Sequence, residues 1–233
     1  MSNVMLKVED LHVAYGQSEA LHGISFEGLA NETVAIMGRN GMGKTTLFKA
    51  LMGILPVKSG RIEVAGQDVT RDESFRRVAK GIAYVPQGRM IFPTLTVEEN
   101  IRTGLENSAT RRIPDEIYAL FPVLFDMKRR KGGNLSGGQQ QQLAIARALV
   151  TEPKVLLLDE PTEGIQPSII KDIARALNEI RKMKGITIVV SEQVLSFAMD
   201  VADRLFVIEG GRLVHETARD KTDEAHIKAY LSV

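Results

Sequence analysis

The stretch "ETVAIMGRNGMGKTTLFKALMGIL", residues 32–55, joins an apolar run, a glycine-rich turn and a segment of helical spacing. Its centre, residues 38–46, satisfies the pattern G-x-x-x-x-G-K-[ST], whose structural context is a preceding strand and a following helix. Both neighbours are present, because "ETVAIMG" is typical of a buried strand and "KTTLFKALMGIL" is typical of a helix. We therefore favour a phosphate-binding loop over an ordinary glycine turn before a helix.

The residue types of this loop suit a nucleoside triphosphate. Its glycines let successive backbone N–H groups point at phosphate oxygens, and the helix N-terminus adds positive potential. We expect Lys44 to reach the β- and γ-phosphates and the Thr45 hydroxyl to bind Mg²⁺, which prefers hard oxygen ligands. The loop residues predicted to bind nucleotide are Gly38, Arg39, Asn40, Gly41, Met42, Gly43, Lys44, Thr45 and Thr46.

A second motif of the same chemistry is "VLLLDE", residues 155–160. The apolar run predicts a buried strand that places Asp159 at its carboxyl end, where α/β sheets bind ligands. Asp159 would hold Mg²⁺ through water, and Glu160 would polarise the attacking water. Two adjacent carboxylates at the end of so apolar a strand favour these roles over a merely solvated strand end.

The remaining patterns indicate an α/β protein. Short β-like runs fill residues 4–36, and apolar strands alternate with helical segments after residue 151, which predicts a mostly parallel sheet between helices. A helix is expected over residues 169–184, and "RLFVIEGGRLVHE" is typical of a Gly-Gly hairpin.

The stretch from about residue 94 to residue 150 differs from its surroundings because its patterns are helical. Thr96 and Glu99 have the spacing of a capping box, which marks the start of a helix. Four apolar residues recur at i, i+3, i+4 and i+7 and predict one face of a helix: Ile117, Leu120, Phe121 and Leu124. We interpret this stretch as a helical insert in the α/β domain.

Composition narrows the class of protein. Of the 233 residues 44% are hydrophobic and 25% charged, which favours a folded domain over a disordered chain. The net charge of +1 disfavours wholesale nucleic-acid binding, and the absence of cysteine excludes disulfides and thiolate metal sites. No apolar run approaches the ~20 residues that span a bilayer, so we expect other subunits to hold the protein at any membrane it serves.

"NLSGGQQQQLAIARAL", residues 134–149, resembles the signature of the ATP-binding cassette (ABC) ATPases, and the motifs of nearly the whole chain follow that family's order. Ser136 is also a good helix N-cap, and a serine, two glycines and a helix N-terminus form a second anion site. In this family two cassettes pair head to tail, and each signature closes on the partner's ATP. The resemblance assigns that role to Leu135, Ser136, Gly137, Gly138 and Gln139.

The resemblance also implies a fold. It is the ABC ATPase fold: a P-loop NTPase core with a mostly parallel sheet, an N-terminal antiparallel β portion and a helical signature subdomain. Residues 1–233 would form a single domain. Within it, residues 1–93 and 151–233 would form the α/β core, and about 94–150 the helical subdomain.

Two further site residues come from the resemblance. Tyr15 matches the aromatic residue that stacks on adenine, although an ordinary strand tyrosine has the same pattern. Gln87 matches the glutamine that contacts Mg²⁺ and the transmembrane partner. The expected metal ligands are therefore Thr45, Gln87 and Asp159.

Within the family, "YVPQGRMIFPTLTVEENI" and "DEPTEGIQPSII" look like the ATPases of the hydrophobic amino acid uptake group, and "TEGIQPSI" looks most like its urea and short-chain amide branch. This implies an ATP-hydrolysing importer subunit for urea or short-chain amides, with a branched-chain amino acid importer as the alternative. Two other readings stay open: a cassette that acts on nucleic acid without transport, and a nucleotide-binding subunit with negligible turnover.

The resemblance implies partners as well. They are a second, related but non-identical cassette, two transmembrane permease subunits and a solute-binding protein, with no nucleic acid. The subunit would use Mg²⁺ with ATP and lie peripherally on the cytoplasmic face of the inner (plasma) membrane.

Two residues depart from the family pattern. Gln166 stands where an aspartate commonly crosses to the partner cassette, and Gln193 stands where the family's switch histidine is expected. A glutamine donates and accepts hydrogen bonds but does not titrate. We expect Gln193, together with Glu160, to act in catalysis by sensing the γ-phosphate through geometry, unless it only caps a strand end and faces solvent.

Overall fold

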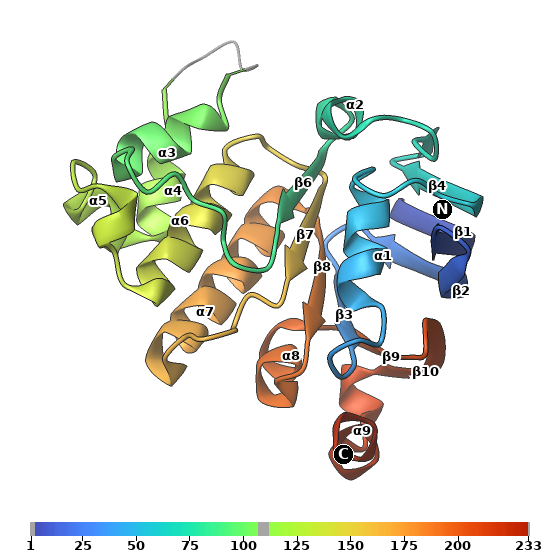
Figure 1. Ribbon diagram of the computed structural model, residues 1–233. Coiled ribbons are helices and arrows are strands. Elements are labelled where there is room, and N and C mark those ends of the chain that lie inside the picture. Colours follow the sequence, from blue (N-terminus) through green and yellow to red (C-terminus); the bar gives the residue numbers. More distant parts are fainter. Residues whose placement is uncertain (1–2, 107–111, 233) are drawn as a thin grey trace.

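The computed structural model describes residues 3–106 and 112–232, and a six-stranded sheet organises it (Figure 1). Neighbouring strands from β9 to β6 are parallel, and β10 is antiparallel to β9. In spatial order the strands are β10 (Arg212–Ala218), β9 (Arg204–Glu209), β3 (Thr33–Met37), β8 (Thr187–Glu192), β7 (Val155–Asp159) and β6 (Ile82–Val85). The predicted mostly parallel sheet is confirmed, and the segments that follow its parallel strands emerge at one edge.

Both faces of this sheet are covered. Alternate side chains of a strand point to opposite faces, so Leu156 and Leu158 pack into one hydrophobic core while Val155 and Leu157 pack into another. Strands buried on both faces have the continuous apolar sequence of "VLLLD" rather than an alternating one.

The second core lies between the large sheet and a four-stranded antiparallel sheet, which confirms the predicted N-terminal β portion. Its order is β2 (Ser18–Leu29), β1 (Val4–Tyr15), β4 (Ser59–Val64) and β5 (Gln67–Asp68). Helix α1 (Lys44–Leu51) contributes Leu47, Phe48 and Leu51 to this core. The turn between β1 and β2 therefore lies near the N-terminus of α1, where Tyr15 meets Thr46.

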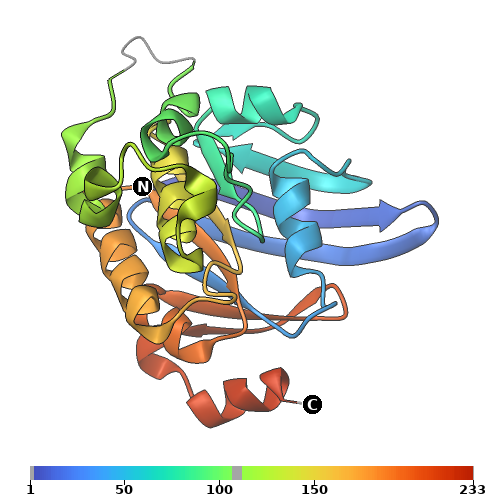
Figure 2. The ribbon, with the colours of Figure 1, turned by 60° about the vertical axis from the view of Figure 1, so that its left-hand side comes forward.

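The first core is covered by helices, which Figure 2 shows on the side of the molecule away from the antiparallel strands. The helices that contribute to it are α3 (Val97–Thr103), α4 (Asp115–Leu120), α5 (Pro122–Asp126), α6 (Gly137–Leu149), α7 (Pro167–Lys184), α8 (Leu195–Val201) and α9 (Glu224–Leu231), with 3-10 turns at Gly132–Asn134 and Arg219–Lys221. Helix α2 (Ser74–Ala79) lies instead beside β6. Among the described residues no helix combines the length and apolar character required to cross a membrane.

The capping box at the start of α3 is confirmed. The Thr96 N–H donates to Glu99 Oε2 at 2.7 Å, and the Glu99 N–H donates to Thr96 Oγ1 at 3.2 Å. The single helix face predicted from Ile117 to Leu124 is wrong, because α4 ends at Leu120 and α5 begins at Pro122. Proline has no N–H to donate and disfavours the helical conformation of the residue before it. Ile117, Phe121 and Leu124 are nevertheless buried in the first core.

Helix α7 begins two residues earlier than expected, at Pro167 rather than Ile169. Proline is favoured at the first helical position, where its missing N–H has no intrahelical partner to lose. The Gly-Gly hairpin is confirmed between β9 and β10.

Candidate nucleotide-binding and catalytic site

A cavity of about 690 Å³ lies at the edge of the large sheet where β3 and β7 end. The loop between β3 and α1 forms one wall, and the antiparallel sheet contributes residues around Tyr15 to another. The lining residues are Tyr15, Glu19, Ala20, His22, Asn40, Gly41, Gly43, Lys44, Thr45, Thr46, Gln87, Glu160, Gly210 and Gly211. The structure thus brings most of the predicted loop residues together with Tyr15, Gln87 and Glu160.

The loop has the backbone expected of an anion site. Gly43, with φ of 109°, precedes the first residue of α1, and within the described part of the chain no side chain caps this helix N-terminus. The N–H groups of the first turn are therefore left for another acceptor. Gly38 is required for close packing, because a Cβ there would lie 2.6 Å from the carbonyl oxygen of Ile208.

Lys44 is buried, and its ammonium group donates to two backbone carbonyls and forms an ion pair with Glu160. Its Nζ lies 2.6 Å from the Gly38 oxygen, 2.9 Å from the Arg39 oxygen and 2.9 Å from Glu160 Oε1. A bound phosphate would compete with these three groups for the ammonium of Lys44. Glu160 is the anionic one, so it is the acceptor that a phosphate would displace.

Asp159 sits in a network of hydroxyl groups. Ser191 Oγ donates to its carboxylate at 2.6 Å, Tyr84 OH at 3.2 Å and Thr45 Oγ1 at 3.3 Å. Burial raises the pKa of Asp159, and the three hydroxyl donors oppose that shift. A carboxylate and a hydroxyl held together are hard oxygen ligands of the kind that fit Mg²⁺.

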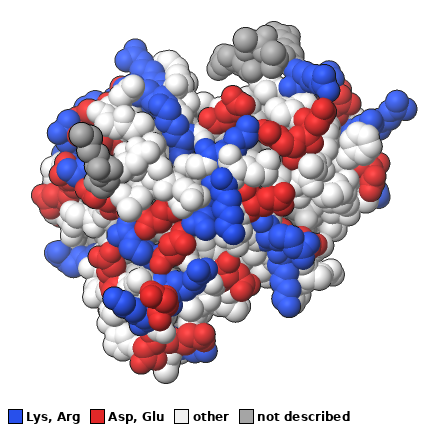
Figure 3. Space-filling view, turned by 180° about the vertical axis from the view of Figure 1, so that it is seen from behind, with Lys and Arg blue, Asp and Glu red and all other residues white. Residues whose placement is uncertain are grey.

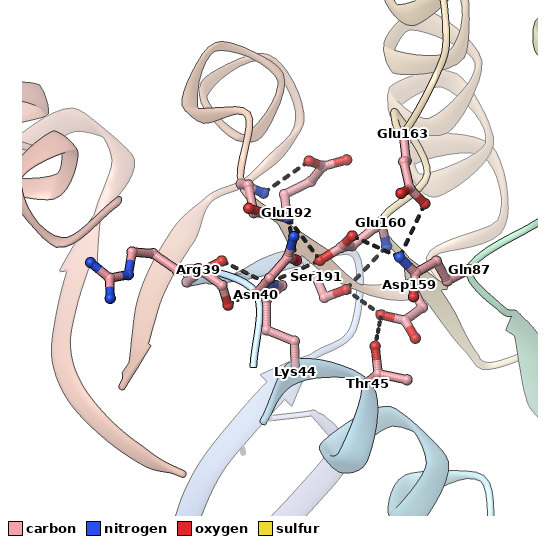
Figure 4. Close-up of polar contacts among 12 residues, drawn as sticks. Arg39, Asn40, Lys44, Thr45, Gln87, Asp159, Glu160, Glu163, Ser191 and Glu192 are labelled. Carbon is pink, nitrogen blue, oxygen red and sulfur yellow. Dashed lines mark hydrogen bonds and ion pairs between the residues drawn. The ribbon is translucent and has the colours of Figure 1, made fainter. Parts of the chain in front are cut away.

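Glu160 is held from several sides (Figure 4). Its carboxylate accepts from Gln193 Nε2 at 3.1 Å and from Gln87 Nε2 at 3.2 Å, in addition to its contact with Lys44. The Glu160 backbone has φ of 48°, and its N–H donates to the Ser191 oxygen. Left-handed backbone at a non-glycine residue is unfavourable and concentrates at functional sites, where surrounding contacts maintain it.

Gln193 points into the site. Its Nε2 donates to Asn40 Oδ1 at 2.8 Å as well as to Glu160, so it joins the phosphate loop to the candidate catalytic carboxylate. The alternative that this side chain only caps a strand end and faces solvent is wrong. Its proposed role toward a γ-phosphate stays a prediction.

Several polar residues that the motifs did not single out complete the site. Tyr84 and Ser191 hold Asp159, and Glu163 accepts from Gln87 Nε2 at 3.0 Å. The buried carboxylate of Glu192 accepts from the N–H groups of Thr162, Gln193 and Val194, and burial raises its pKa. The available signal was positional, because Ser191 and Glu192 end an apolar strand beside the strand of Asp159.

Three residues predicted to bind nucleotide or metal make other contacts in the structure. Arg39 turns away from the cavity and donates to the Ser232 oxygen at 3.0 Å, and Met42 packs against the second core. Gln87 contacts Glu160 and Glu163, and no hydrogen bond joins it to Thr45 or Asp159.

The predicted signature residues lie outside this cavity, since none of them is among its lining residues. Ser136 begins α6 through a capping box that uses its own N–H and that of Gln139. The backbone N–H groups of Gly137 and Gly138 make no hydrogen bond with any residue that the structure describes. Gly138 packs closely on α7, since an added Cβ would lie 2.7 Å from Ile169 Cγ2 and one of the two would have to shift. These observations are compatible with a second anion site separate from the first.

Comparison with known proteins gives concordant matches. A family model described as "ABC transporter" matches residues 21–163. The chain is 40% identical to the high-affinity branched-chain amino acid transport ATP-binding protein BraG of Pseudomonas aeruginosa, over 91% of this chain and 93% of the relative. It is 34% identical to the probable branched-chain amino acid transport ATP-binding protein LivF of Archaeoglobus fulgidus, over 90% of each. A solved ATP-binding subunit of an ABC transporter matches with a TM-score of 0.84 and 26% identity, over 97% of this chain and 99% of that one.

Proposed function

The chain belongs to the ABC transporter family, and we propose that it is the ATP-hydrolysing subunit of an importer for branched-chain or similar hydrophobic amino acids. It has the ABC ATPase fold and is an ATPase coupled to transport. The observation that carries the ATP-hydrolysing role is the convergence of Lys44, Asp159 and Glu160 at the N-terminus of helix α1.

We propose the following division of roles. The loop N–H groups and Lys44 hold the phosphates, and Tyr15 stacks on adenine beside Thr46. Thr45 and Asp159, with Gln87, would hold Mg²⁺, which neutralises charge on the phosphates when bound. Glu160, released from Lys44 when phosphate replaces it, accepts a proton from the attacking water.

The separate anion site at the start of α6 supports a head-to-tail pair of cassettes. In that arrangement Gly137, Gly138 and Ser136 would close on the ATP of a partner cassette, related but non-identical. Gln166 would make a neutral contact across the pair. Two permease subunits and a solute-binding protein would complete the importer, with this subunit peripheral on the cytoplasmic face of the inner membrane.

The choice of solute rests on similarity rather than on the site. "TEGIQPSI" resembles the urea and short-chain amide branch, but the BraG and LivF proteins are both branched-chain amino acid transport proteins by name. We therefore propose an amino acid over urea. The division into an α/β core of residues 1–93 and 151–233 and a helical subdomain of about 94–150 remains part of this proposal.

A nucleic-acid partner has little support. On the face shown in Figure 3, Lys and Arg side chains are interspersed with Asp and Glu side chains. The net charge of +1 is likewise far from the strong basic excess of nucleic-acid-binding domains.

The transporter that co-purifies with this chain should be reconstituted in vesicles and tested with radiolabelled leucine and radiolabelled urea. We expect ATP-dependent accumulation of leucine, and ATP turnover that rises when permeases and the loaded binding protein are present. Accumulation of urea alone would move the assignment to the other branch. Turnover indifferent to the permeases would contradict a transport role.

Substitution of Gln193 tests its role in ATP turnover. Gln193→Ala removes its hydrogen bonds to Glu160 and Asn40, each worth about 0.5–1.5 kcal/mol net, so turnover of the assembled complex should fall about 2- to 10-fold. ATP affinity should change little. Gln193→His should be tolerated, since imidazole also donates a hydrogen bond. Wild-type turnover in Gln193→Ala would remove this residue from the mechanism.

A further inference from the structure

The turn that follows Gln87 has an unusual backbone. Gly88, Arg89 and Met90 have φ values of 80°, 67° and 45°, so three consecutive residues adopt left-handed conformations. Only glycine does so without crowding between Cβ and the backbone. The turn is closed by hydrogen bonds from the Arg89 N–H to the Pro86 oxygen and from the Met90 N–H to the Gly88 oxygen. Such a conformation at Arg89 and Met90 persists only where neighbouring contacts require it.

The turn aims the Arg89 guanidinium at two other segments. Its Nη2 donates to the Glu163 backbone oxygen at 3.0 Å. The same group lies over Gly137, where an added Cβ would be 3.2 Å from Nη1 and 3.3 Å from Nη2. A Cβ on Gly164 would lie 3.6 Å from Nη2. Arg89 thus fills the space between the loop after Glu160 and the first residue of α6.

The Arg89 guanidinium packs between two backbone segments and forms no described ion pair. Among the described residues no carboxylate lies within salt-bridge distance of Arg89. The one described hydrogen bond of its guanidinium goes to a backbone carbonyl, which fixes a loop position rather than neutralising a charge.

Two side chains from the same turn therefore hold residue 163. Gln87 contacts the Glu163 carboxylate and the Glu160 carboxylate, and Arg89 contacts the Glu163 backbone. A displacement of Gly137 would press on the guanidinium and, through Glu163 and Gln87, reach Glu160. The contacts form a continuous chain from the start of α6 to the candidate general base.

We propose that Arg89 is a positioning residue that couples the signature, which serves the partner's ATP, to Glu160, which serves the chain's own ATP. The inference rests on the proposed head-to-tail function and adds a physical link between its two sites. Because the guanidinium occupies the space beside Gly137, where an added Cβ would lie 3.2 Å from Nη1, closure of the signature on an anion would be transmitted to the loop of Glu160.

The test uses Arg89→Gly in the assembled transporter. Glycine accepts the φ of 67° without strain, so the variant removes the guanidinium and keeps the turn. We expect turnover to fall about tenfold, while the ATP affinity of the isolated subunit stays within about twofold and the melting temperature does not fall. Arg175→Ala, which removes an exposed arginine from α7, serves as the control and should turn over like wild type.

A double variant distinguishes coupling from a general defect. If Arg89 acts through the signature, Arg89→Gly combined with Ser136→Ala should lose little more turnover than Ser136→Ala alone, because coupled residues are not additive. Multiplied losses, wild-type turnover in Arg89→Gly, or a lowered melting temperature would each overturn the coupling role. A wild-type complex with no ATP turnover would instead contradict the proposed function.

Discussion

Replacement of Glu160 by glutamine is expected to lower ATP turnover by about 10²- to 10⁴-fold, the usual contribution of a general base. The amide keeps the shape of the carboxylate but does not accept a proton at neutral pH. ATP should still bind, because Lys44 and the loop N–H groups remain. Loss of the acid also removes the anion that competes with phosphate for Lys44, which lies 2.9 Å away, so binding should hold or improve.

Single-turnover ATPase measurements on the assembled complex, with ATP binding measured separately, check this expectation. Glu179→Gln makes the same chemical change at an exposed position of α7 and should leave both quantities unchanged. If dimers separate only after hydrolysis, Glu160→Gln should also accumulate as an ATP-bound dimer in size-exclusion chromatography. Turnover within a few fold of wild type would remove Glu160 from the chemistry.

Local sequence was sufficient for the phosphate loop and the strand of Asp159. The pattern of residues 38–46 between a strand and a helix predicts the loop, and the apolar run 155–158 is buried as its composition predicts. Around Phe121 the apolar spacing predicts one helix, but Pro122 divides it into α4 and α5, because proline has no N–H to donate to a continuing helix.

The partners of these motifs could not be read from local sequence. Ser191, which donates to Asp159, is 32 positions away from it in the sequence, and Arg89 is 74 positions away from its acceptor Glu163. Such pairings depend on strand order, in which β8 lies beside β7, and on one turn with left-handed backbone. Gln193 is the intermediate case: its position at a strand end was evident, but only the order β3-β8 places it beside Asn40.

The two anion sites should respond differently to substitution. Lys44→Ala removes charge-assisted hydrogen bonds to phosphate, each worth about 1.5–3 kcal/mol, so the ATP affinity of the isolated subunit should fall roughly 10²-fold. Ser136→Ala should leave that affinity within about twofold, since Ser136 is not among the residues that line the cavity of Lys44. Ser136→Ala should instead lower turnover once the cassettes are paired. Titration of each isolated variant with a fluorescent ATP analogue measures the first effect, and steady-state turnover of the complex measures the second.

The interpretation of Lys44→Ala depends on Glu160. Lys44 is the only cation within salt-bridge distance of that buried carboxylate among the described residues, so its removal leaves Glu160 with the amides of Gln87 and Gln193. A change in folding could therefore imitate a loss of binding. Lys44→Ala combined with Glu160→Gln removes the uncompensated charge, and the loss of ATP affinity should persist in the double variant because phosphate still lacks its ammonium donor. Recovery of affinity there would show that Lys44 acts on Glu160 alone, and equal losses of affinity in Lys44→Ala and Ser136→Ala would contradict the assignment of the signature to the partner's ATP.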